Sequence, residues 1–182
     1  HAAGIFFTSG SASAGIICES QSAFDRKADC DLIPGGSSLG GVVKVRIKWI
    51  ENVAFVGESE SGHALVMDGA PEGGGRNLGP RPMETVLIGT GGCTAYDVVH
   101  ILRKSRAPVT DCVVEISAER ADQDPKVFTR IHFHFVVTGK SLKREQVERA
   151  IHLSAEKYCS ASIMLAKTAA ITHDFEIREA GN

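Results

Sequence analysis

The sequence lacks the features that mark several large classes of protein. Its five cysteines form no CxxC pair and no ladder at zinc-finger spacing. No apolar run approaches the length needed to span a bilayer. A formal net charge of -2 leaves no excess of positive charge for a broad nucleic-acid surface. We therefore expect neither a zinc-ribbon protein, nor a membrane partner, nor a nucleic-acid partner.

A disulfide scaffold and a nucleotide cofactor are also unexpected. An odd number of cysteines leaves at least one unpaired, and their pattern fits a reducing cytoplasm better than a disulfide-rich fold. The glycines at 73–75 and 89–92 match no phosphate-binding fingerprint. With 182 residues, the chain is long enough for one domain with a substantial core. The expectation is a cytoplasmic protein without a resident cofactor or metal.

The first 41 residues differ in composition from the rest of the chain. They are rich in Ser, Gly and Ala, and they end in the run PGGSSLGG at 34–41. No basic segment precedes the short apolar stretch at 5–7, as a signal peptide would require. We expect 1–41 to be a non-core extension, flexible and of cloning or upstream origin, followed by the domain proper at 42–182. A short strand or helix docked on the domain is the alternative.

From residue 42 onward the pattern predicts an α+β fold. Val45, Ile47 and Trp49 alternate with basic residues, which indicates a half-buried strand with a basic outer face. Further strands are expected at 53–57, 63–68, 109–120, 127–138 and 173–178, and helices at 82–106, 143–158 and 162–170. Pro82 suits the first position of its helix, and Ser141 is a candidate N-cap of the next. The order β-β-β-α-β-β-α-α-β predicts antiparallel meanders packed against two main helices.

Cys93 lies in the predicted helix at 82–106, beside three glycines that disfavour a helix. Gly89, Gly91 and Gly92 each cost about 1 kcal/mol relative to alanine in a helix interior. Close approach of a second helix is the expected compensation. The predicted helix that ends near Cys159 is the candidate, and its approach would bring the two thiols together. A two-thiol redox site is the resulting hypothesis.

The helical projection places Cys93 on a small and polar face. At 100° per residue, the apolar stripe consists of Leu87, Ile88, Ala95, Val98, Val99 and Leu102. Cys93 falls nearly opposite this stripe, on the same side as Asp97 and His100. A reactive thiol must ionise, and the charge of Asp97 would oppose this. A buried, inert thiol is the alternative explanation.

The sequence places no cation directly beside Cys93. His100 is about 10 Å along the helix, which is too far for contact. Arg46, Arg76 and Arg81 are candidates that only the fold can test. Glu84 lies near the helix start, where it could reach Cys93 only through a distortion of the helix.

Three segments around these residues resemble the OsmC/Ohr family of osmotically inducible and organic hydroperoxide resistance proteins. They are Pro82-Met83-Glu84, Gly91-Gly92-Cys93 and Ala155-Glu156-Lys157-Tyr158-Cys159. The similarity is greatest to the YhfA-like branch and extends over 42–180. It implies an OsmC-like fold, in which antiparallel sheets wrap around two central helices of an intertwined homodimer.

The resemblance also implies a chemistry. Cys93 matches the cysteine that attacks the peroxide, and Cys159 matches the cysteine that resolves the sulfenic acid to a disulfide. A small dithiol such as dihydrolipoamide would be the reductant. Glu84 and an arginine would supply supporting charges. The family peroxidases carry Glu directly after the helix-start proline, where this chain has Met83, and an arginine for which 52–62 has no counterpart.

These departures leave a second hypothesis open. A non-enzymatic member of the same fold would act as a redox-responsive protein or would bind a small hydrophobic ligand. Three weaker patterns need no functional explanation. His132 and His134 share a strand face and could bind a metal, but a polar outer face is favoured. A zinc site of Cys93, His100 and Cys159 has no local spacing to support it, and Cys112 suits strand packing.

Overall fold

The computed structural model describes residues 41–181. The predicted extension at 1–41 lies outside the described residues, apart from Gly41. The strands are β1 (Val45–Glu51), β2 (Ala54–Ser59), β3 (Ala64–Met67), β4 (Val109–Arg120), β5 (Phe128–Gly139) and β6 (Ala170–Glu179). The helices are α1 (Pro82–Lys104), α2 (Arg144–Leu153) and α3 (Ser160–Leu165), with a 3₁₀ turn at Pro71–Gly73 and a π-helical turn at Ser154–Tyr158. The predicted order of strands and helices is therefore confirmed.

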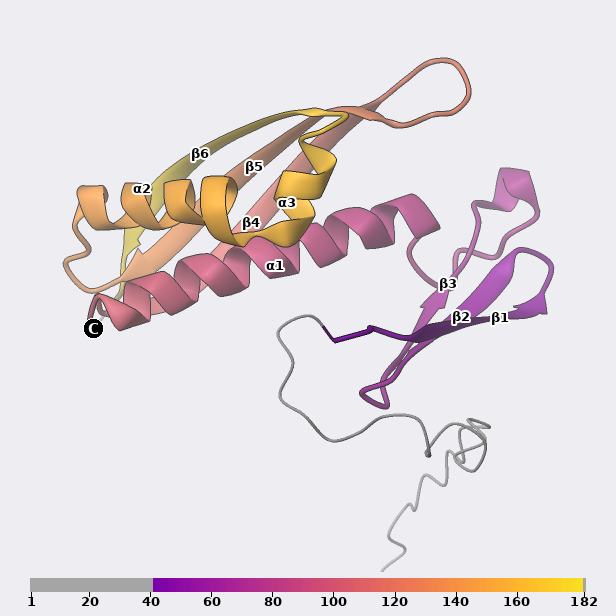
Figure 1. Cartoon of the computed structure of the whole chain (residues 1–182), viewed down its shortest axis with the longest axis horizontal. Coiled ribbons are helices and arrows are strands. Elements are labelled where there is room, and N and C mark those ends of the chain that lie inside the picture. Colours follow the sequence, from indigo (N-terminus) through magenta and orange to yellow (C-terminus); the bar gives the residue numbers. More distant parts are fainter. Residues whose placement is uncertain (1–40, 182) are drawn as a thin grey trace, which may run out of the picture. The chain divides into compact units, whose positions relative to one another are not determined.

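The strands form two sheets, and one pairing differs from the prediction. Strands β1, β2 and β3 form an antiparallel sheet, and β4, β5 and β6 form the other. Strand β5 pairs antiparallel with β4 but parallel with β6. The expectation of purely antiparallel sheets is therefore wrong at β6. The reason is the crossover through α2 and α3, which returns the chain to the end of the sheet where β5 began (Figure 1).

The core lies between the second sheet and the helices α1 and α2. Its fully buried side chains include Val98 and Leu102 of α1, Val147, Ala150 and Ile151 of α2, and Ile131, Phe135 and Val137 of β5. Figure 1 shows α1 and α2 crossing the same face of this sheet. Alternate residues of β5 point into this core, as the period of a strand requires. The candidate site lies where α1 meets the end of α2.

Helix α1 begins at Pro82 as predicted and ends at Lys104, two residues before the predicted end. Pro82 occupies its first turn, and the Arg81 backbone N–H donates to the Glu84 carboxylate at 2.9 Å. Arg103 and Lys104 occupy the last turn, where positive charge opposes the helix dipole. By length and composition alone, α1 would also suit a membrane span. Because Val98 and Leu102 are completely buried against the sheet and α2, we assign α1 as the core helix.

The second helical region is interrupted, contrary to the single helix expected over 143–158. Helix α2 ends at Leu153 and continues as the π-helical turn, after which Cys159 caps α3. The predicted N-cap at Ser141 is also wrong. Ser141 has a left-handed backbone with φ of 52°, its N–H donates to Glu179 at 3.1 Å, and Lys143 is the N-cap.

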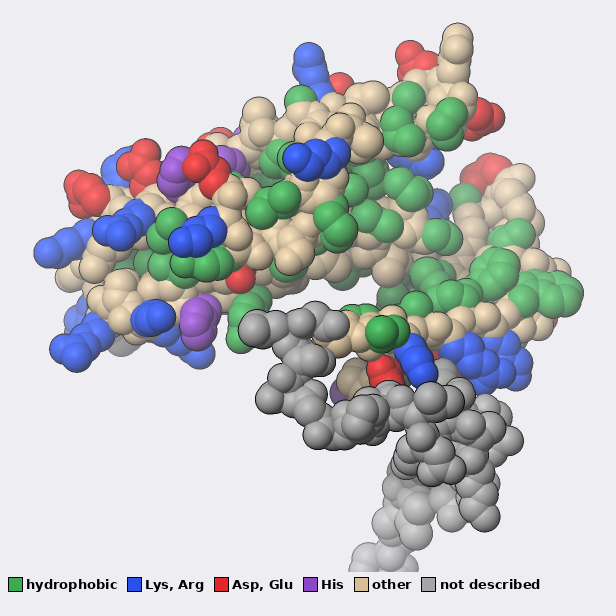
Figure 2. All heavy atoms as spheres, viewed as in Figure 1, with side chains coloured by type: hydrophobic (Ala, Val, Ile, Leu, Met, Phe, Trp, Pro, Cys, Tyr) green, Lys and Arg blue, Asp and Glu red, His purple; other side chains and the backbone are tan. Residues whose placement is uncertain are grey.

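The first sheet leaves an apolar face uncovered in the single chain. Val45, Ile47 and Trp49 of β1 are 65%, 55% and 62% exposed, although their alternation predicted a half-buried strand. Figure 2 shows hydrophobic side chains gathered along one side of these strands and lysine or arginine along the other. An apolar face of this kind typically marks an interaction surface.

Candidate functional site

Two helical segments bring the predicted thiols together. The Cys93 sulfur, the Cys159 sulfur and a carboxylate oxygen of Asp97 all lie within 4.8 Å of one another. Cys93 and Asp97 come from the middle of α1 and are partly buried, whereas Cys159 is completely buried between the π-helical turn and α3. The expectation that the two segments cross at their cysteines is confirmed.

The glycines of α1 have a different partner from the one expected. A Cβ at Gly91 would lie 2.6 Å from the Ile116 side chain of β4, so Gly91 allows the helix to approach the sheet. At Gly89 and Gly92 an added Cβ would meet nothing within 4 Å. Close approach of a second helix is therefore the wrong explanation for these glycines. The surface of α1 at Gly89 and Gly92 is open in the single chain.

A buried hydroxyl network holds Asp97 beside the thiols. The Ser154 hydroxyl, at the start of the π-helical turn, donates to Asp97 Oδ2 at 3.2 Å. Thr94 Oγ1 lies 2.9 Å from the same hydroxyl and must be the donor there, because the one proton of Ser154 is already used. This network ties α1 to the π-helical turn. Sequence reasoning missed it, although Thr94 next to Cys93 was a visible signal.

Cys159 has its own hydrogen-bond donors. It is the N-cap of α3, and the Ser162 hydroxyl and backbone N–H both donate to its sulfur, at 3.0 and 3.4 Å. The φ and ψ of Cys159, -71° and 96°, break the helix at this residue. The Cys159 sulfur lies beside Cys93 and Asp97 of α1. π-Helical turns are rare and often occur at functional sites.

Burial raises the pKa of the Cys93 thiol above its usual range. The neighbouring Cys159 thiol and the negative charge of Asp97 act in the same direction, and the Ala161 backbone N–H partly opposes them. Each candidate arginine pairs with a carboxylate instead: Arg46 with Glu58, Arg76 with Glu51 and Arg81 with Glu84. None of these three arginines therefore activates the thiol pair, and no described cation is among the groups that shift the pKa of Cys93.

The structure does not bring Glu84 to the thiols. It caps the start of α1, where hydrogen bonds from the Arg81 backbone and guanidinium lower the pKa of its carboxyl. Its position is nine residues before Cys93, or about 13 Å along the helix axis. The expected role of Glu84 beside Cys93 stays a prediction.

Asp97→Asn is expected to make Cys93 more reactive. Removing the negative charge lowers the pKa of the Cys93 thiol, so more thiolate is present at neutral pH. Asparagine keeps an oxygen that can accept the Ser154 hydrogen bond. The measurement is the rate of Cys93 alkylation by iodoacetamide at pH 7.5, followed by peptide mass spectrometry, and we expect a several-fold increase. Asp111→Asn, beside Cys112, is the matched control and should leave this rate unchanged. A rate that is equal or lower in Asp97→Asn contradicts the assignment.

Two cavities border the thiol site. One of about 620 Å³ reaches Asp97 and is lined by His100, Lys104 and Arg149. Another, of about 230 Å³, has apolar walls of Phe133 and Phe135. It is also bordered by Thr94 and Ser162, which flank Cys93 and hydrogen-bond Cys159 respectively. The site therefore has a charged side and an apolar side.

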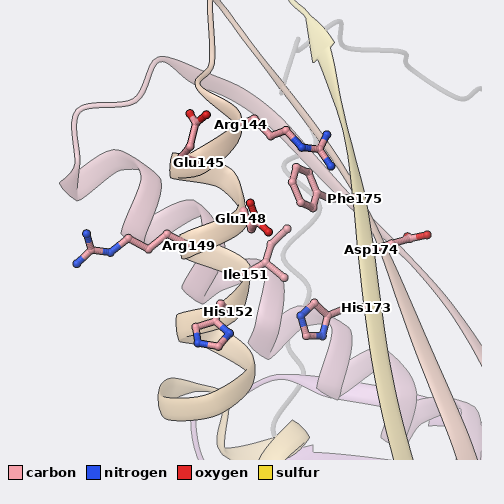
Figure 3. A pocket seen from close by; sticks show the side chains of 9 residues that line it. All are labelled: Arg144, Glu145, Glu148, Arg149, Ile151, His152, His173, Asp174 and Phe175. Carbon is pink, nitrogen blue, oxygen red and sulfur yellow. The ribbon is translucent and has the colours of Figure 1, made fainter.

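Another cavity lies away from the thiol site. It is an open groove of about 580 Å³ between α2 and β6 (Figure 3). The Arg144 guanidinium lies 4.6 Å from the centre of the Phe175 ring at one end, and His152 and His173 lie together at the other. Its rim of exposed, mutually compensating charges is typical of an ordinary protein surface.

His132 and His134 of β5 form part of a polar outer face, because both contact polar side chains of β6. His134 hydrogen-bonds Asp174 of β6, and His132 lies 2.8 Å from the Thr172 hydroxyl. The carboxylate of Asp174 raises the pKa of His134. His100 stacks on Tyr96 with ring centroids 6.0 Å apart. The group that lies near both cysteines is therefore Asp97, and not His100 as in the zinc site considered from the sequence.

Comparisons with known proteins agree with this fold. The family model described as OsmC-like protein matches residues 73–174. Protein YhfA of Escherichia coli K12 is 49% identical over 135 residues, which span 74% of this chain and 98% of YhfA.

Solved structures extend the similarity. The crystal structure of a hypothetical protein from Aquifex aeolicus is 26% identical, with a TM-score of 0.69 over 78% of this chain and 100% of that one. A structure from Legionella pneumophila titled organic hydroperoxide resistance protein OsmC has a TM-score of 0.57 over 75% of this chain and 97% of that one. At 14% identity it shows a shared fold alone.

Proposed function

The chain belongs to the OsmC-like family, and on that premise we propose that it reduces organic hydroperoxides through a cycle of Cys93 and Cys159. The observation that supports this most is the approach of the two sulfurs to within 4.8 Å, from elements far apart in the sequence. Some structures of the same fold carry the name organic hydroperoxide resistance protein.

The cycle has three balanced steps. The Cys93 thiolate attacks the outer peroxide oxygen, the O–O bond breaks, and the alkoxide leaves and takes up a proton as the alcohol. Cys93 is now a sulfenic acid, which the Cys159 sulfur attacks to form the disulfide and release water. A dithiol then reduces the disulfide by thiol–disulfide exchange and becomes a disulfide itself. Because the sulfurs are already neighbours, the second step requires only local movement.

The geometry favours a small reductant and a substrate with an apolar group. Cys159 is completely buried and Cys93 is partly buried, so a small dithiol such as dihydrolipoamide can approach where a protein surface cannot. The apolar cavity lined by Phe133 and Phe135 offers a place for an alkyl or aryl group beside the site. The described cysteines are all free thiols, which is consistent with a cytoplasmic location.

The proposal includes a homodimer. The single chain exposes apolar side chains on two elements: Val45, Ile47 and Trp49 on β1, and Val86, Ile88 and Tyr96 on α1. Gly89 and Gly92 of α1 also face open space. A second copy of the chain would cover these surfaces. It is also a source of the cation that the described chain does not place beside Cys93.

Ile47→Glu is expected to convert the dimer to a monomer. A buried charge without a partner strongly disfavours an interface, whereas Ile47 is 55% exposed in the single chain and contributes little to its core. Light scattering after size exclusion should give twice the 19.4 kDa chain mass for the wild type and the chain mass for the variant. Lys48→Glu, on the opposite face of β1, should remain dimeric. A wild type that is monomeric at micromolar concentration contradicts the proposal.

Turnover with cumene hydroperoxide and dihydrolipoamide tests the enzymatic function. We expect one dithiol oxidised for each peroxide consumed, at a rate of roughly 1 s⁻¹ or more, as in ordinary enzymes. A rate no higher than that of the dithiol alone would exclude it.

The raised pKa of Cys93 favours a second candidate function. A protein with a slow thiol would act as a redox-responsive or small-ligand-binding member of the fold. Native mass spectrometry of the protein purified from cells would show a retained hydrophobic ligand, and peroxide would oxidise the thiols slowly. Turnover at the rate given above excludes this candidate.

A further inference from the structure

The thiol site has the donor set of a metal centre. Two cysteine sulfurs and one carboxylate oxygen lie within 4.8 Å of one another, and no other His, Cys, Asp or Glu group among residues 41–181 meets this criterion. Sulfur ligands of a tetrahedral zinc ion lie about 3.8 Å apart, given Zn–S bonds of about 2.3 Å. The two sulfurs would therefore need to contract by about 1 Å at most.

The donor chemistry selects among metals. Thiolates favour zinc over magnesium or calcium, and a carboxylate is a common third zinc ligand. Three protein ligands with an open fourth position are typical of zinc sites that exchange a ligand with solvent. The cavity of about 620 Å³ reaches the donor set at Asp97, which is one of its lining residues.

The surrounding hydrogen bonds orient the donors as outer partners of a metal site do. Ser154 donates to Asp97 Oδ2, so Oδ1 has no hydrogen-bond partner in the described part of the chain. Thr94 fixes Ser154 in turn, and Ser162 fixes the Cys159 sulfur. Partners of this kind are usual around metal ligands and strengthen binding.

We propose that Cys93, Cys159 and Asp97 bind a Zn²⁺ ion when the thiols are reduced, with water as the fourth ligand. Binding releases the two thiol protons and occupies both sulfurs. The zinc form cannot form the sulfenic acid or the disulfide until the metal leaves. Zinc therefore inhibits and protects the dithiol reversibly. The inhibition rests on the proposed peroxide reduction, whereas the binding does not.

Competition with a chromophoric chelator tests the binding without any peroxide. Anaerobically reduced full chain, carrying Cys18→Ser and Cys30→Ser to remove other thiols, is titrated with Zn²⁺ and separately with Co²⁺. We expect one ion per chain and, for Co²⁺, sulfur-to-metal charge-transfer absorption. Cys93→Ser should abolish that absorption. Asp97→Asn and Ser154→Ala should weaken Zn²⁺ affinity roughly tenfold or more. Cys112→Ser and Asp111→Asn are matched controls and should bind as the parent does.

Asp97→Asn separates a ligand from a residue needed only for folding. It should lose zinc affinity while its circular dichroism spectrum and thermal unfolding stay those of the parent, and a misfolded variant would not combine these results. Binding that is substoichiometric, or equally tight in Cys93→Ser and Asp97→Asn, overturns the proposal.

A second arm tests the inhibition. Zinc-loaded wild type should react with cumene hydroperoxide at least roughly tenfold more slowly than the metal-free protein, and a chelator should restore the rate. An equal rate in the two forms overturns the inhibition. If the metal-free protein does not react at all, the peroxidase function fails while the zinc titration still decides the metal site.

Discussion

Cys93→Ser is expected to reduce the reaction with organic hydroperoxide by roughly a thousandfold or more, to the background level. The serine hydroxyl ionises so weakly near neutral pH that it cannot replace the thiolate as nucleophile. Cys159 cannot substitute, because it is completely buried and out of reach of the peroxide. The measurement is the rate of peroxide loss in a single turnover, with the protein in excess.

Cys112→Ser is the matched control for this variant. Burial and the charge of Asp111 raise the pKa of the Cys112 thiol to about 11, so almost none of it is ionised at neutral pH. Its replacement should leave the rate unchanged. If Cys93→Ser reacts as fast as the wild type, or if the loss follows Cys112 instead, Cys93 is not the nucleophile.

Cys159→Ser is expected to separate the first step from the rest of the cycle. Peroxide should still oxidise Cys93, since the attacking sulfur is unchanged, but the sulfenic acid has no neighbouring thiol to resolve it. Steady-state turnover with dihydrolipoamide should then fall roughly a hundredfold or more, and excess peroxide should drive Cys93 to the sulfinic acid. Dimedone labelling and peptide mass spectrometry measure both products.

Serine suits this position because its oxygen can still accept the Ser162 hydrogen bonds. Circular dichroism of the variant should therefore match that of the wild type. Full turnover in Cys159→Ser would show that the reductant acts directly on the sulfenic acid, and Cys159 would then have no resolving role.

The order of strands and helices could be predicted because it depends on local signals. Alternation marked β4 and β5 to within a residue or two, and Pro82 marked the start of α1. The direction of β6 could not be predicted in this way. An alternating strand has the same pattern whether its neighbour is parallel or antiparallel, and here the crossover through α2 and α3 decides.

The thiol pair was predictable from its two local contexts, but the network around it was not. The link from Thr94 through Ser154 to Asp97 depends on the π-helical turn at Ser154–Tyr158, and the pattern there is that of an ordinary helix. Ile88 was also expected in the apolar stripe of α1, but it is 59% exposed. Periodicity identifies an apolar face but cannot tell whether the same chain or a second copy covers it.

The most direct test of the proposed cycle is the product of a single oxidation. Anaerobically reduced wild type is mixed with one equivalent of cumene hydroperoxide, and its thiols are counted before peptide mapping. The proposal predicts that each chain loses two thiols and contains a Cys93–Cys159 disulfide, as the neighbouring sulfurs allow. Retention of every thiol, or a disulfide that does not join Cys93 to Cys159, would contradict it.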